Sequence, residues 1–157
     1  MRGAFNRGVV LGPLVDGEPT PPFVSVAILE FSSPEVALEV LEAIRKAPND
    51  LPTSIPVPRG RRALAADPDI SEAAATLAFA GAFNEEDPTA AVDSAGVDFV
   101  TSNRLVTVDV LGGLSAADAM AAAVDLATQQ AACLASDDPC SSVKLPPALQ
   151  VQADASG

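Results

Sequence analysis

In two parts of the chain, a stretch of alternating apolar and polar residues is followed by a stretch in which apolar residues recur at helical spacing. This pattern predicts two units, each made of a strand and a helix. In the first unit, residues 23–31 carry apolar side chains on both sides of an extended segment. This pattern is typical of a central strand that is covered on both faces or lies at an interface. Residues 34–46 then repeat apolar side chains at helical spacing behind a Ser-Ser-Pro-Glu start. On this helix we expect Glu42 and Lys46 to pair across one turn.

The second unit lies in the C-terminal half of the chain. Residues 97–101 and 104–111 alternate as two strands, and Ser102-Asn103 between them predicts a hairpin turn. The sequence Leu-Ser-Ala-Ala-Asp then marks the start of an Ala-rich helix, which we expect to run over residues 116–134. Because Asp109 interrupts one apolar face of the second strand, we expect that face to be at least partly exposed to water.

The remaining segments are less regular. Residues 4–15 and 75–83 alternate well enough to predict two further strands. Prolines restrict residues 47–58 to an extended loop, and residues 84–96 are polar and loop-like. Residues 143–151 predict either a last strand or a segment lying along the surface.

The two units align over residues 24–44 and 106–126, with Val, Leu, Ser and Ala at matching offsets. This alignment has two explanations: the unit was duplicated, or any strand followed by a capped amphipathic helix gives a similar pattern. In either case we expect an α+β fold: a two-layer antiparallel sheet with two helices on one face, ferredoxin-like if the unit is duplicated. The length predicts a single domain over residues 1–150, followed by a disordered tail over 151–157.

Composition narrows the function classes. Twenty-one acidic residues against nine basic ones give a net charge of −12, which disfavours binding to nucleic acid and to anionic lipid. The chain contains no His, the commonest acid–base group near neutral pH. No apolar run approaches the roughly 18 residues that would span a bilayer. We therefore expect no nucleic-acid partner, and membrane contact only through association with other subunits.

Cys133 and Cys140 are the only cysteines, and the turn sequence Asp-Asp-Pro lies between them. A disulfide between these two residues is one interpretation, and it would indicate an oxidising compartment. A pair of reduced, buried thiols is a second interpretation. A redox or metal role is a third, although the spacing is not Cys-x-x-Cys and neither a His nor a third Cys is present.

Two clusters of charged residues are candidate sites. The acids Glu85, Glu86, Asp87 and Asp93 could hold a hard cation, but they lack an EF-hand pattern, which favours a solvated loop. The basic cluster Arg59, Arg61 and Arg62 could pair with nearby acids or dock a carboxylate or phosphate. From these patterns we predict no catalytic residue, no cofactor-binding residue and no metal ligand.

Three segments of the chain resemble extracytoplasmic α+β domains of lipoproteins and sensor proteins of high-GC bacteria. These segments are the hairpin Ser102-Asn103-Arg104, the strand over residues 105–110 and the Gln-rich helix end over residues 129–133. The chain departs from that pattern by lacking a lipobox Cys, Trp and Tyr. The resemblance implies an extracytoplasmic location, secreted or on the cell surface.

The hypothesis that follows is a non-catalytic extracytoplasmic domain that binds a protein partner or a small ligand. The alternative is an accessory or structural subunit of a larger, membrane-associated assembly, with the Pro-rich loop and the tail as contact arms. An oligomer is compatible with both. An open, apolar sheet face or a long tail crossing onto a neighbour would favour assembly, whereas a closed pocket with convergent polar groups would favour ligand binding. An enzyme is a third, disfavoured hypothesis, which paired carboxylates with shifted pKa values in such a pocket would support.

Overall fold

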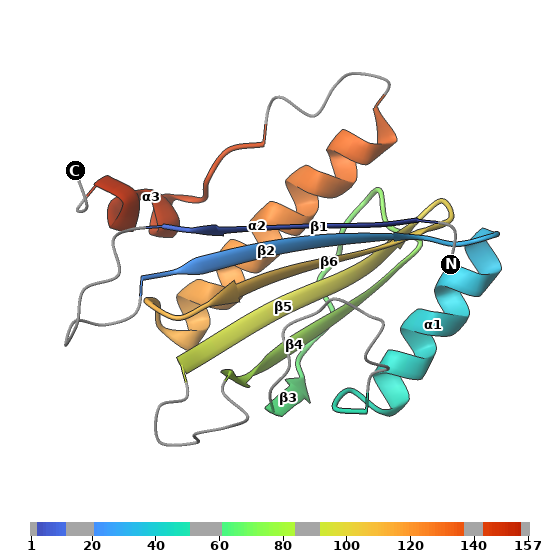
Figure 1. Cartoon of the computed structure of the whole chain (residues 1–157), viewed down its shortest axis with the longest axis horizontal. Helices are drawn as coiled ribbons and strands as arrows, with labels where there is room; N and C mark the ends of the chain where they lie inside the picture. Colours follow the sequence, from blue (N-terminus) through green and yellow to red (C-terminus); the bar gives the residue numbers. More distant parts are fainter. Residues whose placement is uncertain (1–2, 12–20, 51–60, 84–91, 137–142, 155–157) are drawn as a thin grey trace.

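The computed structural model of the chain describes residues 3–11, 21–50, 61–83, 92–136 and 143–154. Within these residues, six antiparallel strands form one sheet in the order β1-β2-β6-β5-β4-β3, so β1 and β3 lie at its edges (Figure 1). The strands are β1 (Gly3–Val10), β2 (Phe23–Glu30), β3 (Arg61–Leu64), β4 (Ala75–Phe83), β5 (Val92–Thr101) and β6 (Arg104–Leu111). The helices are α1 (Pro34–Lys46), α2 (Ala116–Ala135) and α3 (Pro147–Asp154).

The sheet and its helices confirm the predicted α+β class, but the placement of both helices on one face was wrong. Consecutive residues of a strand point to opposite faces. On β6, Leu105 packs with α1, whereas the next residue, Val106, packs with α2. The two helices therefore cover opposite faces of the sheet, which makes three layers rather than two. The ferredoxin-like duplication is not confirmed.

The connections after β2 and β6 differ, and this difference accounts for the two faces. β2 continues through Phe31 directly into α1, and Phe31 packs in the same cluster as that helix. β6 is followed by Gly112 and Gly113, both with left-handed backbone angles (φ 69° and φ 68°). Glycine adopts this region readily because it has no Cβ. The glycine pair thus gives the chain a turn toward the opposite face, where α2 begins.

The two cores are built from different side chains. The α1 side uses large residues, including Phe79, Leu41 and Ile44, all of which are buried. The α2 side combines a column of valines on β6 with the alanines of α2. Small side chains let this helix lie close to the sheet, so its packing depends on many short contacts.

Most predicted elements are confirmed. β2, β4, α1 and α2 lie where the patterns placed them, and the hairpin turns at Ser102-Asn103. The expected loop over residues 84–96 was wrong from Val92 onward, because residues 92–96 pair with β4 as the first half of β5. β3 was not predicted at all, since it is only four residues long.

The C-terminal segment forms the short helix α3 rather than a strand. Leu149 of α3 is fully buried in the core on the α2 side. α3 continues to Asp154, past the boundary that we placed at residue 150. The division into a domain and a disordered tail stays a prediction.

Candidate functional site

Cys133 is buried near the C-terminal end of α2. Cys140 lies outside the described residues, so the disulfide between Cys133 and Cys140 stays a prediction. The structure places Cys133 at the helix end that the sequence indicated, where a link to the following segment would hold that end of α2.

The acidic cluster and the basic cluster are described only in part. Glu85, Glu86 and Asp87 lie outside the described residues, whereas Asp93 is exposed on β5. In the part of the chain that the structure describes, no group of three or more Cys, Asp or Glu could hold a metal ion. Arg59 also lies outside the described residues, and Arg61 and Arg62 belong to the edge strand β3.

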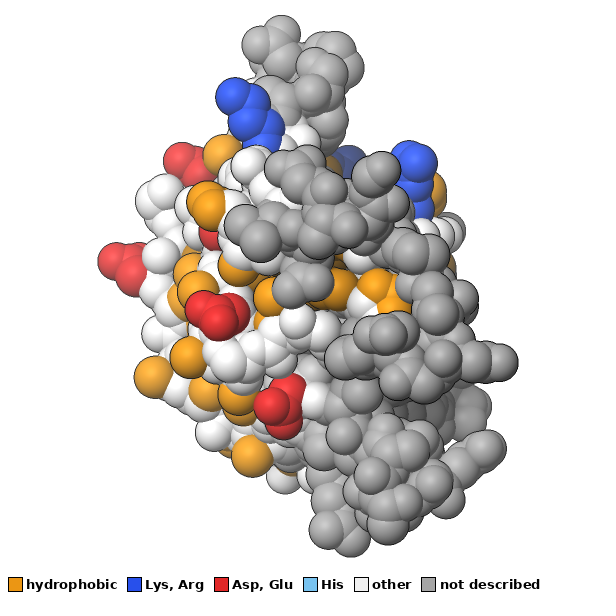
Figure 2. All heavy atoms as spheres, turned by 90° about the vertical axis from the view of Figure 1, so that its left-hand side faces the viewer, with side chains coloured by type: hydrophobic (Ala, Val, Ile, Leu, Met, Phe, Trp, Pro, Cys, Tyr) orange, Lys and Arg blue, Asp and Glu red, His pale blue; other side chains and the backbone are white. Residues whose placement is uncertain are grey.

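Charge on the visible surface is dispersed. In the view of Figure 2, acidic side chains are scattered singly among apolar ones instead of forming one patch. Among the described helices, none is both long and apolar enough to cross a membrane.

β1 is an edge strand of the sheet that the described residues form. It pairs over its full length of eight residues with β2 on one side, and the sheet order ends with it on the other. Residues 3–8 are all exposed. An edge of this kind presents backbone N–H and C=O groups that can pair with another chain. β1 contains no Pro and no Lys, two residues that commonly block such pairing.

The opposite edge has a different character. β3 is half as long as β1, with four residues, and two of them are Arg. Short length and charge are both features that protect an edge against pairing. Leu64 on β3 is nonetheless 47% exposed, which makes it a useful comparison for the apolar residue on β1.

Phe5 is the most exposed large apolar side chain among the described residues, with 55% of its surface accessible. It lies opposite Ile28 of β2, and Ile28 packs with the α2-side core. Phe5 and Arg7 therefore share the α2 face of the edge strand. Arg7 is the only charged residue of β1, so this edge is basic in a chain whose net charge is −12.

On the other face, β1 is tied to β2 by side chains. The Ser25 hydroxyl donates a hydrogen bond to Asn6 Oδ1 over 3.2 Å. The Phe23 ring covers Gly8, where a Cβ would lie 2.6 Å from Phe23 Cε2. An aromatic side chain over a strand glycine supports register in a sheet. β1 is therefore anchored to β2 on one side, and no other described strand pairs with its outer edge.

A row of buried polar residues crosses the centre of the sheet on the α1 side. Ser25 lies opposite Asp109, and Thr107 lies opposite Asp98. All four are buried, so the expectation that the Asp109 face is partly wet was wrong. Asp98 and Asp109 each take part in an interaction with another group. Burial of a charged carboxylate is costly unless the charge is paired.

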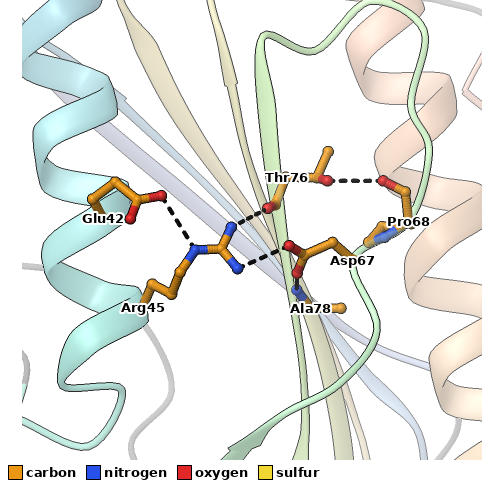
Figure 3. A network of polar contacts seen from close by, with 6 residues as sticks. All are labelled: Glu42, Arg45, Asp67, Pro68, Thr76 and Ala78. Carbon is orange, nitrogen blue, oxygen red and sulfur yellow. Dashed lines mark hydrogen bonds and ion pairs between the residues drawn. The ribbon is translucent and has the colours of Figure 1, made fainter.

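A network around Arg45 connects α1 to β4 and to the segment that precedes β4 (Figure 3). The Arg45 guanidinium donates to the Asp67 carboxylate over 2.8 Å and to the Thr76 carbonyl over 3.0 Å. It also pairs with Glu42, which means that the predicted Glu42–Lys46 pair is replaced by a pair between Glu42 and Arg45. The hydrogen bond to Asp67 raises the pKa of Arg45 above its ordinary value.

Searches of this chain against protein-family models, curated proteins and solved structures gave no match. The candidate site therefore rests on the geometry of β1 alone. Sequence reasoning identified a first strand in this region but not its position at the edge. The signal that could have drawn attention to it is an apolar aromatic beside Arg in a strand that lacks Pro and Lys.

Proposed function

We propose that this chain is a non-catalytic extracytoplasmic interaction domain that binds an extended segment of a protein along β1. The observation that carries the proposal is the open edge of β1, exposed over residues 3–8 and eight residues long as a strand. Such an edge suits strand addition, in which backbone hydrogen bonds supply affinity and alternate side chains supply specificity.

Phe5 and Arg7 would supply that specificity. Both lie on the α2 face of the edge, one position apart along that face. An added strand would cover the exposed Phe5 ring and remove apolar surface from water. Arg7 would favour an acidic or aromatic residue at the neighbouring position.

The accessory-subunit hypothesis depended on the tail as a contact arm. Residues 143–154 instead lie against their own chain, through buried Leu149 and through hydrogen bonds between Gln129 and Lys144. The proline-rich loop lies largely outside the described residues. Its role as a contact arm therefore stays a prediction, and β1 offers a second surface through which this chain could join an assembly.

The extracytoplasmic location and the disulfide between Cys133 and Cys140 belong to the same proposal. The resemblance to extracytoplasmic domains supports the location. The position of Cys133, buried at the end of α2, supports a link that would hold this helix end. A disulfide persists in an oxidising compartment, so the two statements support each other.

The experiment is a selection of displayed random peptides against the immobilised chain. Phe5→Lys places a charge on the edge at an exposed position, and Leu64→Lys makes the same change on the opposite edge. We expect selected peptides to bind the unchanged chain and Leu64→Lys alike, and to bind Phe5→Lys at least about tenfold more weakly.

Amide hydrogen exchange with a selected peptide bound should show added protection in β1. Peptides that bind Phe5→Lys as well as the unchanged chain would overturn the proposal. Failure to select any peptide that protects β1 would overturn it as well. Circular dichroism of both variants would confirm that the substitutions leave the fold intact.

A further inference from the structure

The β1 edge is self-complementary in one particular register. Two β1 strands from two copies can pair antiparallel about a two-fold axis normal to the sheet. Residues that face one another then point to the same side of the joined sheets. If Asn6 faces Asn6 of the second copy, Phe5 faces Arg7 and Ala4 faces Gly8, in both directions.

Neighbouring registers are less favourable. Centring the pair on Arg7 would place two guanidinium groups opposite each other, and like charges directly opposite are destabilising. Centring it on Phe5 would leave Arg7 facing Gly3 and would shorten the paired segment. The Asn6 register avoids the charge repulsion and places each Arg7 beside an aromatic ring, a favourable cation–π arrangement.

We propose that the occupant of the β1 edge is a second copy of this chain, joined through antiparallel β1–β1 pairing centred on Asn6. This proposal rests on the proposed function and names its partner. The two six-stranded sheets would become continuous across the two-fold axis. The pairing covers two exposed Phe5 rings and adds backbone hydrogen bonds between the two edges.

Charge sets the conditions for this association. Each copy carries a net charge of −12, so two copies repel one another at long range. β1 itself carries Arg7 and no acid, so no side chain of the strand adds to this repulsion at the paired edges. Added salt screens the long-range term. Self-association should therefore strengthen as ionic strength rises. Binding to a basic partner would weaken instead, because salt screens attraction as well as repulsion.

A single strand pair buries less than the roughly 1,600 Å² of a standard interface, so we expect micromolar association. Sedimentation equilibrium of the whole chain from about 1 to 500 μM should show a monomer–dimer equilibrium. Its dissociation constant should fall about threefold or more between about 20 and 300 mM NaCl. Phe5→Lys should raise the dissociation constant of the dimer about tenfold, and Leu64→Lys should change it by less than about twofold.

Cross-linking tests the register. Asn6→Cys should give a disulfide-linked dimer under mild oxidation, because the substituted positions face each other across the axis. Ala4→Cys should not, because Ala4 faces Gly8 in this register. Peptide mapping would assign the link to β1. Equal cross-linking of both variants would overturn the register.

A chain that stays monomeric over the whole concentration range would overturn the dimer. This failure is distinct from failure of the proposed function. A monomeric chain that still binds selected peptides along β1 would retain the interaction edge with a different protein as its partner. A dimer that forms equally well with Phe5→Lys would overturn the assignment of β1 as its interface.

Discussion

Gln129 holds the backbone of Lys144 through two hydrogen bonds. Its side-chain amide nitrogen donates to the Lys144 carbonyl over 3.0 Å, and its amide oxygen accepts from the Lys144 N–H over 2.7 Å. A side-chain amide has the same donor and acceptor as a peptide group, so Gln129 acts here as a strand partner would. The contact brings the segment before α3 back onto α2.

Removing this contact should loosen the C-terminal segment. Gln129→Ala deletes both hydrogen bonds, each of which contributes about 0.5–1.5 kcal/mol net. We expect faster hydrogen exchange at the Lys144 amide and faster cleavage within residues 143–146 by a nonspecific protease. Gln130→Ala is the matched control on the same helix. If the Lys144 amide exchanges and residues 143–146 are cleaved at the same rates in both variants, this role for Gln129 is contradicted.

Arg45 should contribute more to stability than its neighbour Lys46. Arg45 joins α1 to Asp67 and to the Thr76 carbonyl, whereas Lys46 is exposed. Arg45→Met keeps the aliphatic stem and should lower the free energy of unfolding by about 1–2 kcal/mol. Lys46→Met should change it by less than about 0.5 kcal/mol. Urea denaturation measures both, and equal losses would contradict the network.

Gly113 should not tolerate a side chain. Its φ is +68°, and a Cβ would lie 2.8 Å from the backbone nitrogen of Pro22. Backbone strain and the clash together should make Gly113→Ala cost about 2–3 kcal/mol of unfolding free energy. Gly3→Ala is the control, because a Cβ there meets nothing within 4 Å. Thermal and urea denaturation at low protein concentration would compare the two variants.

Glu35 should titrate below its ordinary range. A hydrogen bond from Ser33 lowers the pKa of the Glu35 carboxyl at the start of α1. A depressed pKa in the folded state means that Glu35 favours folding above its unfolded pKa. That contribution is lost as the pH falls through the folded value.

Titration of the Glu35 carboxyl carbon by NMR measures this directly. Ser33→Ala should return the pKa of Glu35 toward its ordinary value, and Ser32→Ala should leave it where it is in the unchanged chain. An unchanged titration in Ser33→Ala would show that Ser33 does not cause the shift.

The proposed disulfide has two separate tests. Intact mass under non-reducing conditions should be lower by two hydrogens than under reducing conditions. Closing a short loop stabilises by roughly 2–3 kcal/mol, so Cys133→Ser and Cys140→Ser should destabilise to similar degrees. Because Cys133 is buried, a loss confined to Cys133→Ser would indicate packing alone. Two free thiols in protein made under oxidising conditions would contradict the disulfide.

The local elements could be predicted because their signals are local. Ser115 caps α2 by accepting a hydrogen bond from the Asp118 N–H, as the Ser-Ala-Ala-Asp sequence indicated. The Ser102-Asn103 hairpin likewise follows from two short alternating strands and a two-residue turn. Such signals involve residues within a few positions of one another, so the sequence alone contains them.

The candidate site could not be predicted in the same way. The alternation in residues 4–15 predicts a strand, but its position at an edge depends on which strands are neighbours elsewhere in the sheet. Asp109 shows the same limit, because its burial depends on what covers the sheet and not on β6 itself. A carboxylate within a strand usually indicates that its face of the strand is exposed to water, but the Asp109 side chain lies in the interior.

Periodicity and capping are enough to predict the α+β class, the two main helices and the central hairpin from the amino-acid sequence. The folded structure is needed to show that α1 and α2 cover opposite faces, and that β1 is an edge strand of the described sheet. β6 is apolar on both faces near Leu105 and Val106, so its pattern is compatible with a helix on either side. The face that α2 covers follows from the turn at Gly112-Gly113 and from packing between segments that are far apart in the chain.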